Sequence, residues 1–294
     1  MDLPTQRPGR LKVGVVGAGR VGAVLAAALA RAGHRVVAAS AVASLLRAQE
    51  LLHGLPFLAP QEVVAAADLV LLTVPDDALA DLAAGMVEAG VPVQGRILVH
   101  ASGRHGTAVL APLAREGGLP LALHPVMTFT GRTDDLERLT GVSFGVTAPG
   151  PLRPVAEALV VEMGAEPVWI AEEQRTTYHA ALALGANHLV TLVVEASGLL
   201  RAAGVAEPGR MLGPLLGAAL DNGLRLGGQG LTGPVARGDA GTVSDHLAAL
   251  KAVEPDAVPG YLALARRTAD LALDSGLLKP EDAERLLGVL ADSR

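Results

Sequence analysis

The stretch "LKVGVVGAGRVGAVLAAALARAGHRVVAAS", residues 11–40, decides the fold of the first part of the chain. It begins with an apolar run, Val13–Val16, that is typical of a buried strand. A glycine-rich turn then leads into a helical pattern over about Arg20–Ala32, which Gly33 ends, and a second strand is predicted at Arg35–Ala39. These elements form one strand–helix–strand unit, for which a right-handed crossover between parallel strands is expected.

Five further apolar runs predict additional strands of the same sheet. Near-continuous Val, Leu and Ile runs are typical of a mostly parallel sheet that is buried on both faces. Beyond residue 171 the sequence shows helical periodicity with Gly and Pro breaks. We therefore predict an α/β plus all-α chain, with a flexible tail at 1–10, a Rossmann-like doubly wound domain at 11–170 and an all-helical domain at 171–294. The five runs lie within residues 67–74, 95–103, 119–129, 141–150 and 166–173.

The composition excludes several classes of function. The chain has 294 residues, of which 50% are hydrophobic and 18% charged, so it can bury a sizeable core. Its net charge of −6 argues against a nucleic-acid partner, and the absence of cysteine excludes disulfides and thiolate metal sites. No paired histidine spacing predicts another metal site. No signal peptide is recognised in "MDLPTQRPGR", and the apolar stretches are short or interrupted by His and Asn, so we expect a cytoplasmic protein without a membrane partner.

Residues 17–22, GAGRVG, form a GxGxxG motif between the first strand and the helix, the context in which this motif binds a dinucleotide. Gly17 permits the tight turn, Gly19 lets the backbone approach a pyrophosphate, and Gly22 lets the helix pack on the strand. The free N–H groups at the helix N-terminus then face the anion. The alternative is a glycine-rich turn without a ligand. The predicted cofactor contacts of the motif are Gly17, Ala18, Gly19, Arg20, Val21 and Gly22.

The end of the second strand favours NADP over NAD. NAD enzymes place Asp or Glu there to bind the ribose, whereas residues 38–40 are AAS and the next acid is Glu50. A 2′-phosphate would therefore meet no repulsion. The alternative for Arg47 is a solvated helix residue without a ligand. The residues predicted to bind this phosphate are Ser40, Ser44, Arg47 and Arg20.

Six segments carry a resemblance to a known family. They are "VGVVGAGRVG", "LLTVPDDAL", "VHASG", "HPVMTF", "YHAALALGANHLV" and "LTGPVARGD", and they occur in this order between about Lys12 and Leu290. In them the chain resembles a Rossmann-like NADP-dependent oxidoreductase family whose helical C-terminal domain has no settled function. The wider superfamily contains β-hydroxyacid dehydrogenases, ketopantoate reductases, pyrroline-5-carboxylate reductases and 6-phosphogluconate dehydrogenase-like C-terminal domains. The resemblance implies cofactor contacts at Val74 and Pro75, a substrate bound between the domains, and a homodimer formed through the helical domain.

The segment "TYHAALALGANHLV", residues 177–190, is an apolar helix whose polar side chains include His179 and Asn187. At about 100° per residue, these two side chains share one broad face with Arg175 and Ala183. In the superfamily that the chain resembles, the first long helix of the C-terminal domain lines the active site. We therefore expect this face to meet the nicotinamide and the substrate.

The proton donor is harder to assign than the cofactor loop. Hydride transfer to a ketone leaves an alkoxide, which is best protonated by a general acid with a pKa near 7. Many β-hydroxyacid dehydrogenases carry a lysine on this helix, four residues before an asparagine, and this chain has none there. We therefore expect His179 to donate, with Tyr178 a weaker candidate and His124, at a strand end, a second one. The alternative for His179 is a hydrogen-bonded structural histidine, and Asn187 is expected to bind the substrate or the nicotinamide carboxamide.

Two loops are candidate substrate sites. Ser102 and Gly103 follow a strand, where a hydroxyl and free N–H groups can hold a carbonyl or carboxylate, and an ordinary loop is the alternative. In "LTGPVARGD", Arg237 suits a substrate carboxylate, or it pairs with Asp239 to fix the loop of its own or a partner's site. Thr242 or Ser244 is expected to cap the helix that follows. The predicted substrate-binding residues are Ser102, Gly103, Tyr178, Thr232, Arg237 and Asp239, and Ser102 is also a catalytic candidate.

Three functions are compatible with these features. The first is an NADP-dependent oxidoreductase that reduces a small carbonyl acid, such as 2-ketopantoate, to an alcohol. The second is an imine reductase of the pyrroline-5-carboxylate type, which has less need of a ketone-directed proton donor. The third is a non-catalytic NADP-binding regulator, which the missing helix lysine favours and the polar residues of the apolar helix argue against.

Overall fold

The computed structural model describes residues 9–40 and 49–291, so Ser44 and Arg47 lie outside the described residues. The chain forms two compact units, Met1–Leu184 and Gly185–Arg294. The division falls later than the predicted boundary at residue 170, because helix α8 (Arg175–Leu182) is hydrogen-bonded to the sheet of the first unit.

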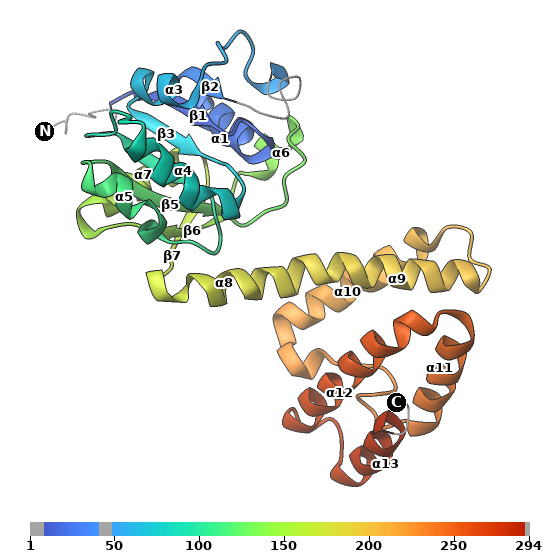
Figure 1. Cartoon of the computed structure of the whole chain (residues 1–294). Helices are drawn as coiled ribbons and strands as arrows, with labels where there is room; N and C mark the ends of the chain where they lie inside the picture. The colour runs from blue at the N-terminus through green and yellow to red at the C-terminus, as the bar shows by residue number, and fades with distance from the viewer. Residues whose placement is uncertain (1–8, 41–48, 292–294) are drawn as a thin grey trace, which may run out of the picture. The chain divides into compact units, whose positions relative to one another are not determined.

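The first unit contains one seven-stranded sheet in the order β2-β1-β3-β4-β5-β6-β7 (Figure 1). All neighbouring strands are parallel except β5 and β6, which confirms the predicted doubly wound, Rossmann-like fold. Since β2 lies on one side of β1 and β3 on the other, the winding reverses at β1, and ligands of such sheets bind outside the carboxyl ends at this point. The strands are β1 (Lys12–Val16), β2 (Arg35–Ser40), β3 (Leu69–Leu72), β4 (Ile97–His100), β5 (Leu119–Pro125), β6 (Ser143–Thr147) and β7 (Glu166–Trp169).

Helices cover both faces of the sheet. Alternate strand residues point to opposite faces, so Leu69 and Leu71 pack in one core cluster whereas Val70 and Leu72 pack in the other. Both faces are therefore buried, as the near-continuous apolar runs predict. The first cluster is covered by α1 (Arg20–Arg31), α6 (Asp134–Arg138) and α7 (Arg153–Glu162), and the second by α3 (Pro60–Ala66), α4 (Asp76–Glu88), α5 (Ala111–Arg115) and the 3-10 helix η1 (Thr107–Leu110).

A buried carboxylate folds the loop that follows β5. Asp135 is fully buried and accepts hydrogen bonds from the Thr130 N–H at 2.8 Å, the Thr130 hydroxyl at 3.1 Å and the Gly131 N–H at 2.7 Å. These bonds compensate for its burial. The loop begins soon after His124, so the Asp135 bonds help to fix the carboxyl end of β5.

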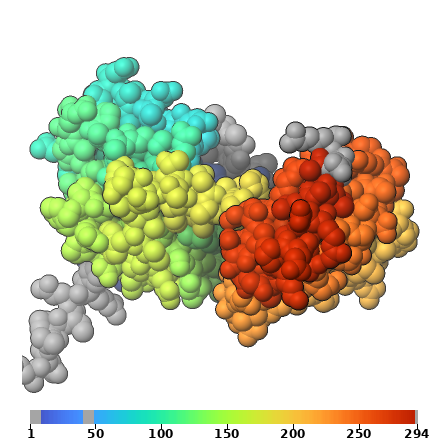
Figure 2. Space-filling view, turned by 90° about the horizontal axis from the view of Figure 1, so that it is seen from below, coloured from blue at the N-terminus to red at the C-terminus, as the bar shows by residue number. Residues whose placement is uncertain are grey.

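The second unit contains helices joined by turns, and its described residues form no strand, as predicted. Its core lies between the last three helices, where Val243, Leu262 and Leu286 are among the buried side chains. Figure 2 shows these C-terminal helices, in orange and red, as a closely packed body. In contrast, α9 has no buried residue, and α10 buries only Pro208 and Leu212. The helices are α9 (His188–Ala202), α10 (Pro208–Leu226), α11 (Ala240–Val253), α12 (Val258–Asp274) and α13 (Pro280–Ala291).

One helical run of the described residues, Glu172–Ala202, is long and apolar enough by length and composition to cross a membrane, and its most apolar window is not buried. The histidines and Asn187 in this run do not lower its mean hydropathy enough to exclude a membrane span, contrary to the expectation from the sequence. Large apolar side chains of α9 are therefore exposed, among them Leu189, Val190 and Val194.

Candidate functional site

The glycine-rich loop is held between the ends of β2 and β3. The N–H groups of Gly17 and Ala18 both donate to the Ser40 carbonyl at 2.9 Å, and the Thr73 hydroxyl donates to the Gly17 carbonyl at 2.8 Å. Gly17 has a φ of 91°, a conformation that glycine adopts without strain. The loop therefore has a fixed shape at the beginning of α1.

The three glycines of the motif serve different purposes. A Cβ at Gly17 would lie 2.9 Å from the Thr73 backbone, and one at Gly22 would lie 2.2 Å from the Thr73 hydroxyl, so packing within the protein excludes larger residues at both positions. A Cβ at Gly19 would meet only the Gly17 carbonyl, at 3.9 Å. No residue in the described part of the chain requires glycine there, which fits the close approach of a ligand to this backbone.

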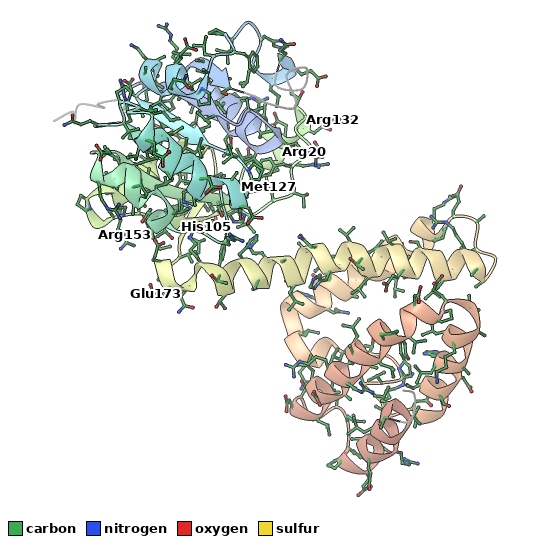
Figure 3. The ribbon with its side chains drawn as sticks, in the orientation of Figure 1. Arg20, His105, Met127, Arg132, Arg153 and Glu173 are labelled. Carbon is green, nitrogen blue, oxygen red and sulfur yellow. The ribbon has the colours of Figure 1, made fainter. Side chains whose placement is uncertain are left out.

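The other predicted cofactor residues of the described chain lie at the same edge of the sheet. Ser40 ends β2 and is 8% exposed, and Val74 and Pro75 connect β3 to α4. Val21 is the second residue of α1, and Arg20 is exposed at its beginning, as Figure 3 shows. These residues surround the loop at the carboxyl ends of β1, β2 and β3.

A second cluster forms at the carboxyl ends of β4 and β5. The Nδ1 atom of His124 lies 2.7 Å from the Tyr178 hydroxyl, and the rings of His124 and His179 meet edge to face at 6.1 Å. A Cβ at Gly103 would lie 2.6 Å from the His179 ring and 3.0 Å from His124 Nε2. Four residues predicted for the site, His124, Tyr178, His179 and Gly103, are therefore in contact with one another.

Burial sets the charge state of this cluster. It lowers the pKa of His124 to about 4, with further contributions from the charges of Arg175 and His179. Burial also raises the pKa of the Tyr178 hydroxyl, against a smaller opposing effect of Arg175. At neutral pH the pair therefore consists of a neutral imidazole and a protonated tyrosine.

The loop that follows β4 is held by hydrogen bonds to a buried histidine, His100. His100 is fully buried, its Nδ1 accepts from the Ser102 N–H at 3.2 Å, and its Nε2 donates to the Gly106 carbonyl at 2.8 Å. Burial lowers its pKa to about 4, so this neutral tautomer is the stable one. The Ser102 oxygen accepts from the His105 N–H at 3.2 Å, so it closes the loop, and its remaining hydrogen is free to donate.

Glu172, which the sequence analysis did not single out, also forms hydrogen bonds with this loop. Its carboxylate accepts from the Thr107 N–H at 2.8 Å, the Thr107 hydroxyl at 3.2 Å and the Ala108 N–H at 3.1 Å, and it thereby caps η1. A side chain at Gly106 would overlap this carboxylate. Glu172 thus connects the segment before α8 to the loop that carries Ser102 and Gly103.

Arg175 joins α8 to three strand ends. Its side chain is buried, and its Nε donates to the Thr147 hydroxyl at 2.8 Å. Its Nη2 donates to the carbonyls of Ala122 at 3.1 Å and Gly145 at 3.0 Å, and its Nη1 lies 3.5 Å from the Ser102 carbonyl. From the sequence, Arg175 was expected only to share a helix face with His179. In the structure it positions the helix that carries Tyr178 and His179.

The helix does not continue with the regular period that the sequence suggested. A π-helical segment, Ala183–Asn187, separates α8 from α9, and each of its turns contains more residues than an α-helical turn. The predicted common face of Arg175, His179 and Asn187 is therefore wrong beyond Ala183. Asn187 is exposed and lies in the second unit, where its role stays a prediction.

The predicted substrate residues of the "LTGPVARGD" segment also lie in the second unit. Thr232 and Arg237 are exposed, and Asp239 caps α11, since its carboxylate accepts from the Thr242 N–H at 3.1 Å and the Thr242 hydroxyl at 2.7 Å. These hydrogen bonds lower the pKa of Asp239. The cap is therefore Asp239, and not Thr242 or Ser244, and among the described residues Arg237 and Asp239 form no ion pair within 4.0 Å. Their contact with a substrate stays a prediction.

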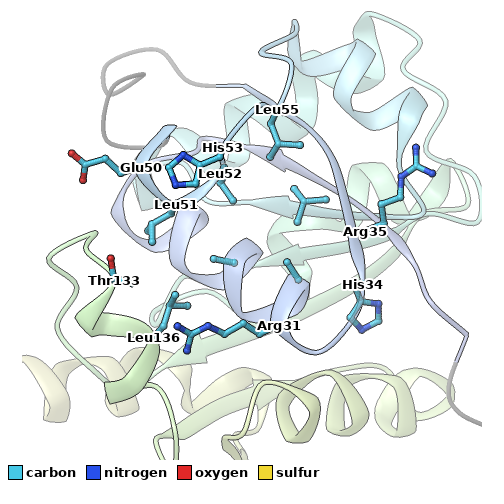
Figure 4. Close-up of a pocket in the computed structure, with 13 residues that line it drawn as sticks. Arg31, His34, Arg35, Glu50, Leu51, Leu52, His53, Leu55, Thr133 and Leu136 are labelled. Carbon is cyan, nitrogen blue, oxygen red and sulfur yellow. The ribbon is translucent and has the colours of Figure 1, made fainter.

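A cavity of about 670 Å³ lies elsewhere on the first unit, beside α1 (Figure 4). Arg31, His34, Glu50 and Leu136 are among its lining residues. None of the described residues predicted for the site lines it. The candidate site is therefore the carboxyl edge of the sheet and not this cavity.

The comparisons with known proteins agree with the fold. Residues 2–125 match the model of the Rossmann-like domain, and residues 142–268 match the domain of unknown function DUF2520. The chain is therefore a Rossmann-like protein that carries a DUF2520 domain. No curated protein matches the chain.

Solved structures share this architecture over most of their length. A candidate NADP oxidoreductase from Bacteroides fragilis is 23% identical with a TM-score of 0.71, and the match covers 89% of this chain and 98% of that one. An imine reductase from Pseudomonas sp. is 19% identical with a TM-score of 0.65, covering 96% and 100%. Plasmodium falciparum pyrroline carboxylate reductase with NADP bound is 12% identical with a TM-score of 0.57, covering 90% and 100%. At these identities the likeness establishes the fold.

The different demands on the loop glycines predict different stabilities of their alanine variants. Gly22→Ala should lower the free energy of unfolding by about 1–3 kcal/mol, because the new Cβ overlaps Thr73. Gly19→Ala should cost less than about 1 kcal/mol, the usual range of a cap preference. Gly85→Ala, in an open position of α4, is the control and should be neutral or stabilising. Urea unfolding of the three variants measures this, and equal stabilities of Gly22→Ala and Gly85→Ala would contradict the packing argument.

Proposed function

We propose that the protein is an NADP(H)-dependent oxidoreductase that reduces a small carbonyl acid. The observation that carries this proposal is the placement of two features at one edge of one sheet. One is the loop with open space at Gly19, and the other is the cluster of His124, Tyr178 and His179. A cofactor whose pyrophosphate meets α1 can extend along the carboxyl ends of the strands toward the cluster.

The choice of NADP rests on the end of β2. Ser40 stands where NAD enzymes carry an acid, and Arg20 is exposed at the beginning of α1, so a 2′-phosphate meets no negative charge among the described residues there. The Plasmodium falciparum neighbour, which has NADP bound, supports the same choice. Gly17, Gly19, Gly22, Val74 and Pro75 would hold the rest of the cofactor.

When bound, NADPH would supply the hydride, and the protein would supply the proton. Tyr178 reaches the cluster from α8, and its hydroxyl hydrogen is free for a substrate oxygen when His124 carries its hydrogen on Nδ1 and donates to the tyrosine oxygen. Transfer of the tyrosine proton to an alkoxide leaves a phenolate. His124 can then pass its Nδ1 hydrogen to that phenolate while its Nε2 takes up a proton from solvent, so that the ring stays neutral. Exchange of the ring hydrogen with solvent then returns it to Nδ1 for the next turnover. In this proposal Tyr178 donates, His124 relays, and His179 borders the substrate.

An imine reductase is the second candidate function. It is favoured by the structural neighbours, which include an imine reductase and a pyrroline carboxylate reductase, and by the absence of a lysine on α8. Reduction of a protonated C=N bond yields a neutral amine directly, so it does not depend on Tyr178 as a donor.

The decisive experiment follows NADPH oxidation at 340 nm with a panel of 2-oxo acids, which includes 2-ketopantoate, and of cyclic imines. NADH runs in parallel, and Gly19→Ala serves as the variant with an altered loop. We expect turnover of a 2-oxo acid with NADPH in the wild type and a loss of at least 10-fold in NADPH affinity in Gly19→Ala. Turnover of imines alone would replace the proposal with the second candidate. Tight NADPH binding without any turnover would leave a cofactor-binding regulator.

Tyr178→Phe tests the assignment of the proton donor. We expect kcat to fall by about 100-fold or more, the usual loss on removal of a general acid, with unchanged affinity for NADPH. His179→Ala should lower kcat much less. Because the pKa of His124 lies at about 4 and that of Tyr178 is raised, kcat should also be flat between about pH 6 and 8. A larger loss in His179→Ala than in Tyr178→Phe would make His179 the donor, and a kcat that changes between pH 6 and 8 would contradict the assignment of Tyr178.

We also propose that the protein forms a homodimer through α9 and α10. Nine large apolar side chains of these helices are 39–79% exposed. At on the order of 100 Å² each they expose about 900 Å² in total, which is about the area that one partner buries in a standard interface. A membrane span suits them less well, because Arg175 near the beginning of the run is bonded within the sheet and Glu195 lies in α9. The nine are Leu189, Val190, Leu192, Val194, Met211, Leu215, Leu220, Leu224 and Leu226.

Light scattering coupled to size-exclusion chromatography tests the homodimer. The wild type should have the mass of two chains in detergent-free buffer. Leu224→Glu, at the most exposed of the nine positions, should shift it toward the monomer. Leu264→Glu, at an exposed apolar position of α12, should not. A monomeric wild type, or one that partitions into lipid vesicles, would contradict the proposal.

A further inference from the structure

Arg175 is a buried cation that forms no ion pair with a described carboxylate. It is 1% exposed, and all its described hydrogen bonds go to uncharged oxygens, those of Thr147, Ala122, Gly145 and Ser102. Among the described residues no carboxylate lies within the 4.0 Å of an ion pair with it. A buried charge that is hydrogen-bonded but not neutralised is costly, and this one lies next to the candidate site.

The position of the charge is set by the residues that also form the cluster. The carbonyl of Ser102 precedes Gly103, and the carbonyl of Ala122 lies two residues before His124. The guanidinium carbon of Arg175 lies 5.7 Å from the centre of the Tyr178 ring. Any group that reacts beside the Tyr178 hydroxyl is therefore within the field of this charge.

The nearby carboxylates oppose this charge only in part. Burial lowers the pKa of Arg175. Glu172 interacts favourably with the guanidinium and raises this pKa, but the Glu172 carboxylate oxygens bond to the N–H groups of η1. His100 and His124 are held neutral by burial, and Arg175 contributes more than Asp76 does to the electrostatic shift of both pKa values. Of the charged groups that shift the pKa values of these two histidines, Arg175 therefore has the largest effect.

We infer that the buried Arg175 makes this a site for a negatively charged substrate whose C=O group is reduced, and that it disfavours a protonated C=N substrate. The inference rests on the proposed function and specifies its substrate class. When a hydride adds to a C=O carbon, the oxygen gains negative charge until it takes the Tyr178 proton. When a hydride adds to a C=N⁺ group, a positive charge is lost and no proton is needed.

The positive charge of Arg175 therefore has opposite effects on the two reactions. Arg175 stabilises the developing alkoxide and a substrate carboxylate, and it repels an iminium ion before it can react. At a separation of about 6 Å and an effective dielectric constant of about 20, one unit charge changes a binding constant on the order of 100-fold. An effect of this size is large enough to set the substrate class.

The first test uses the wild-type protein with NADPH bound, because the reduced nicotinamide ring carries no charge. Calorimetry compares cyclopentanecarboxylate and cyclopentylammonium, two ions of similar shape and opposite charge, with cyclopentanol as the neutral reference. We expect the carboxylate to bind at least 10-fold more tightly than the ammonium ion. Equal affinities, undetectable binding of both ions, or a preference for the ammonium ion would overturn the inference. Absence of NADPH binding would overturn the proposed function itself, so the two failures are distinguishable.

The second test changes the charge at Arg175. Arg175→Lys keeps the charge and should keep the preference for the carboxylate, whereas Arg175→Gln removes the charge and should reduce the preference to less than about 3-fold. Arg115→Gln, at an exposed position of α5, is the control for a surface arginine and should behave as the wild type. Circular dichroism checks the fold of each variant, and if Arg175→Gln does not fold, the wild-type comparison alone decides. A preference that persists in folded Arg175→Gln would show that Arg175 has only a structural role.

Discussion

The hydrogen bonds of Arg175 are the interaction on which the rest of the candidate site depends. They fix the beginning of α8 to β5, to β6 and to the loop that follows β4. Tyr178 and His179 follow on the next turn of the same helix, so the anchor also sets where their side chains lie. Glu172 adds a second attachment, to the loop after β4. Without these contacts α8 would have no reason to belong to the first unit.

Arg175 also contributes a positive charge to the candidate site. In the proposed function, the neutral His124, the protonated Tyr178 and the buried Arg175 suit a reaction that generates negative charge. The glycine-rich loop after β1 supplies the complementary half, a place for the phosphates of a cofactor. The fold brings both halves to one edge because β1, β3, β4 and β5 are parallel, so that their carboxyl ends lie on the same side of the sheet.

The sequence predicted the features that depend on local patterns. The seven strands, the loop at Gly17–Gly22 and the helical second half follow from apolar periodicity and from glycine positions, and the structure confirms them. The anchoring contacts of Arg175 and Glu172 could not be predicted, since they join residues that lie far apart in the chain. The π-helical segment Ala183–Asn187 could not be predicted either, because the apolar periodicity of the sequence does not indicate it. For the proton donor, the sequence analysis favoured His179, whereas our proposal assigns Tyr178, because its hydroxyl is hydrogen-bonded to His124, a contact that the sequence does not reveal.

The central claim is that the loop and the His124–Tyr178 pair serve one ligand-binding site. A crystal structure of the protein with NADPH and a non-reactive 2-oxo acid analogue tests this most directly. The account predicts the pyrophosphate over Gly19 and the analogue's carbonyl oxygen within hydrogen-bond distance, about 3 Å, of the Tyr178 hydroxyl. Cofactor density away from the glycine-rich loop, or an analogue bound out of reach of Tyr178, would contradict it.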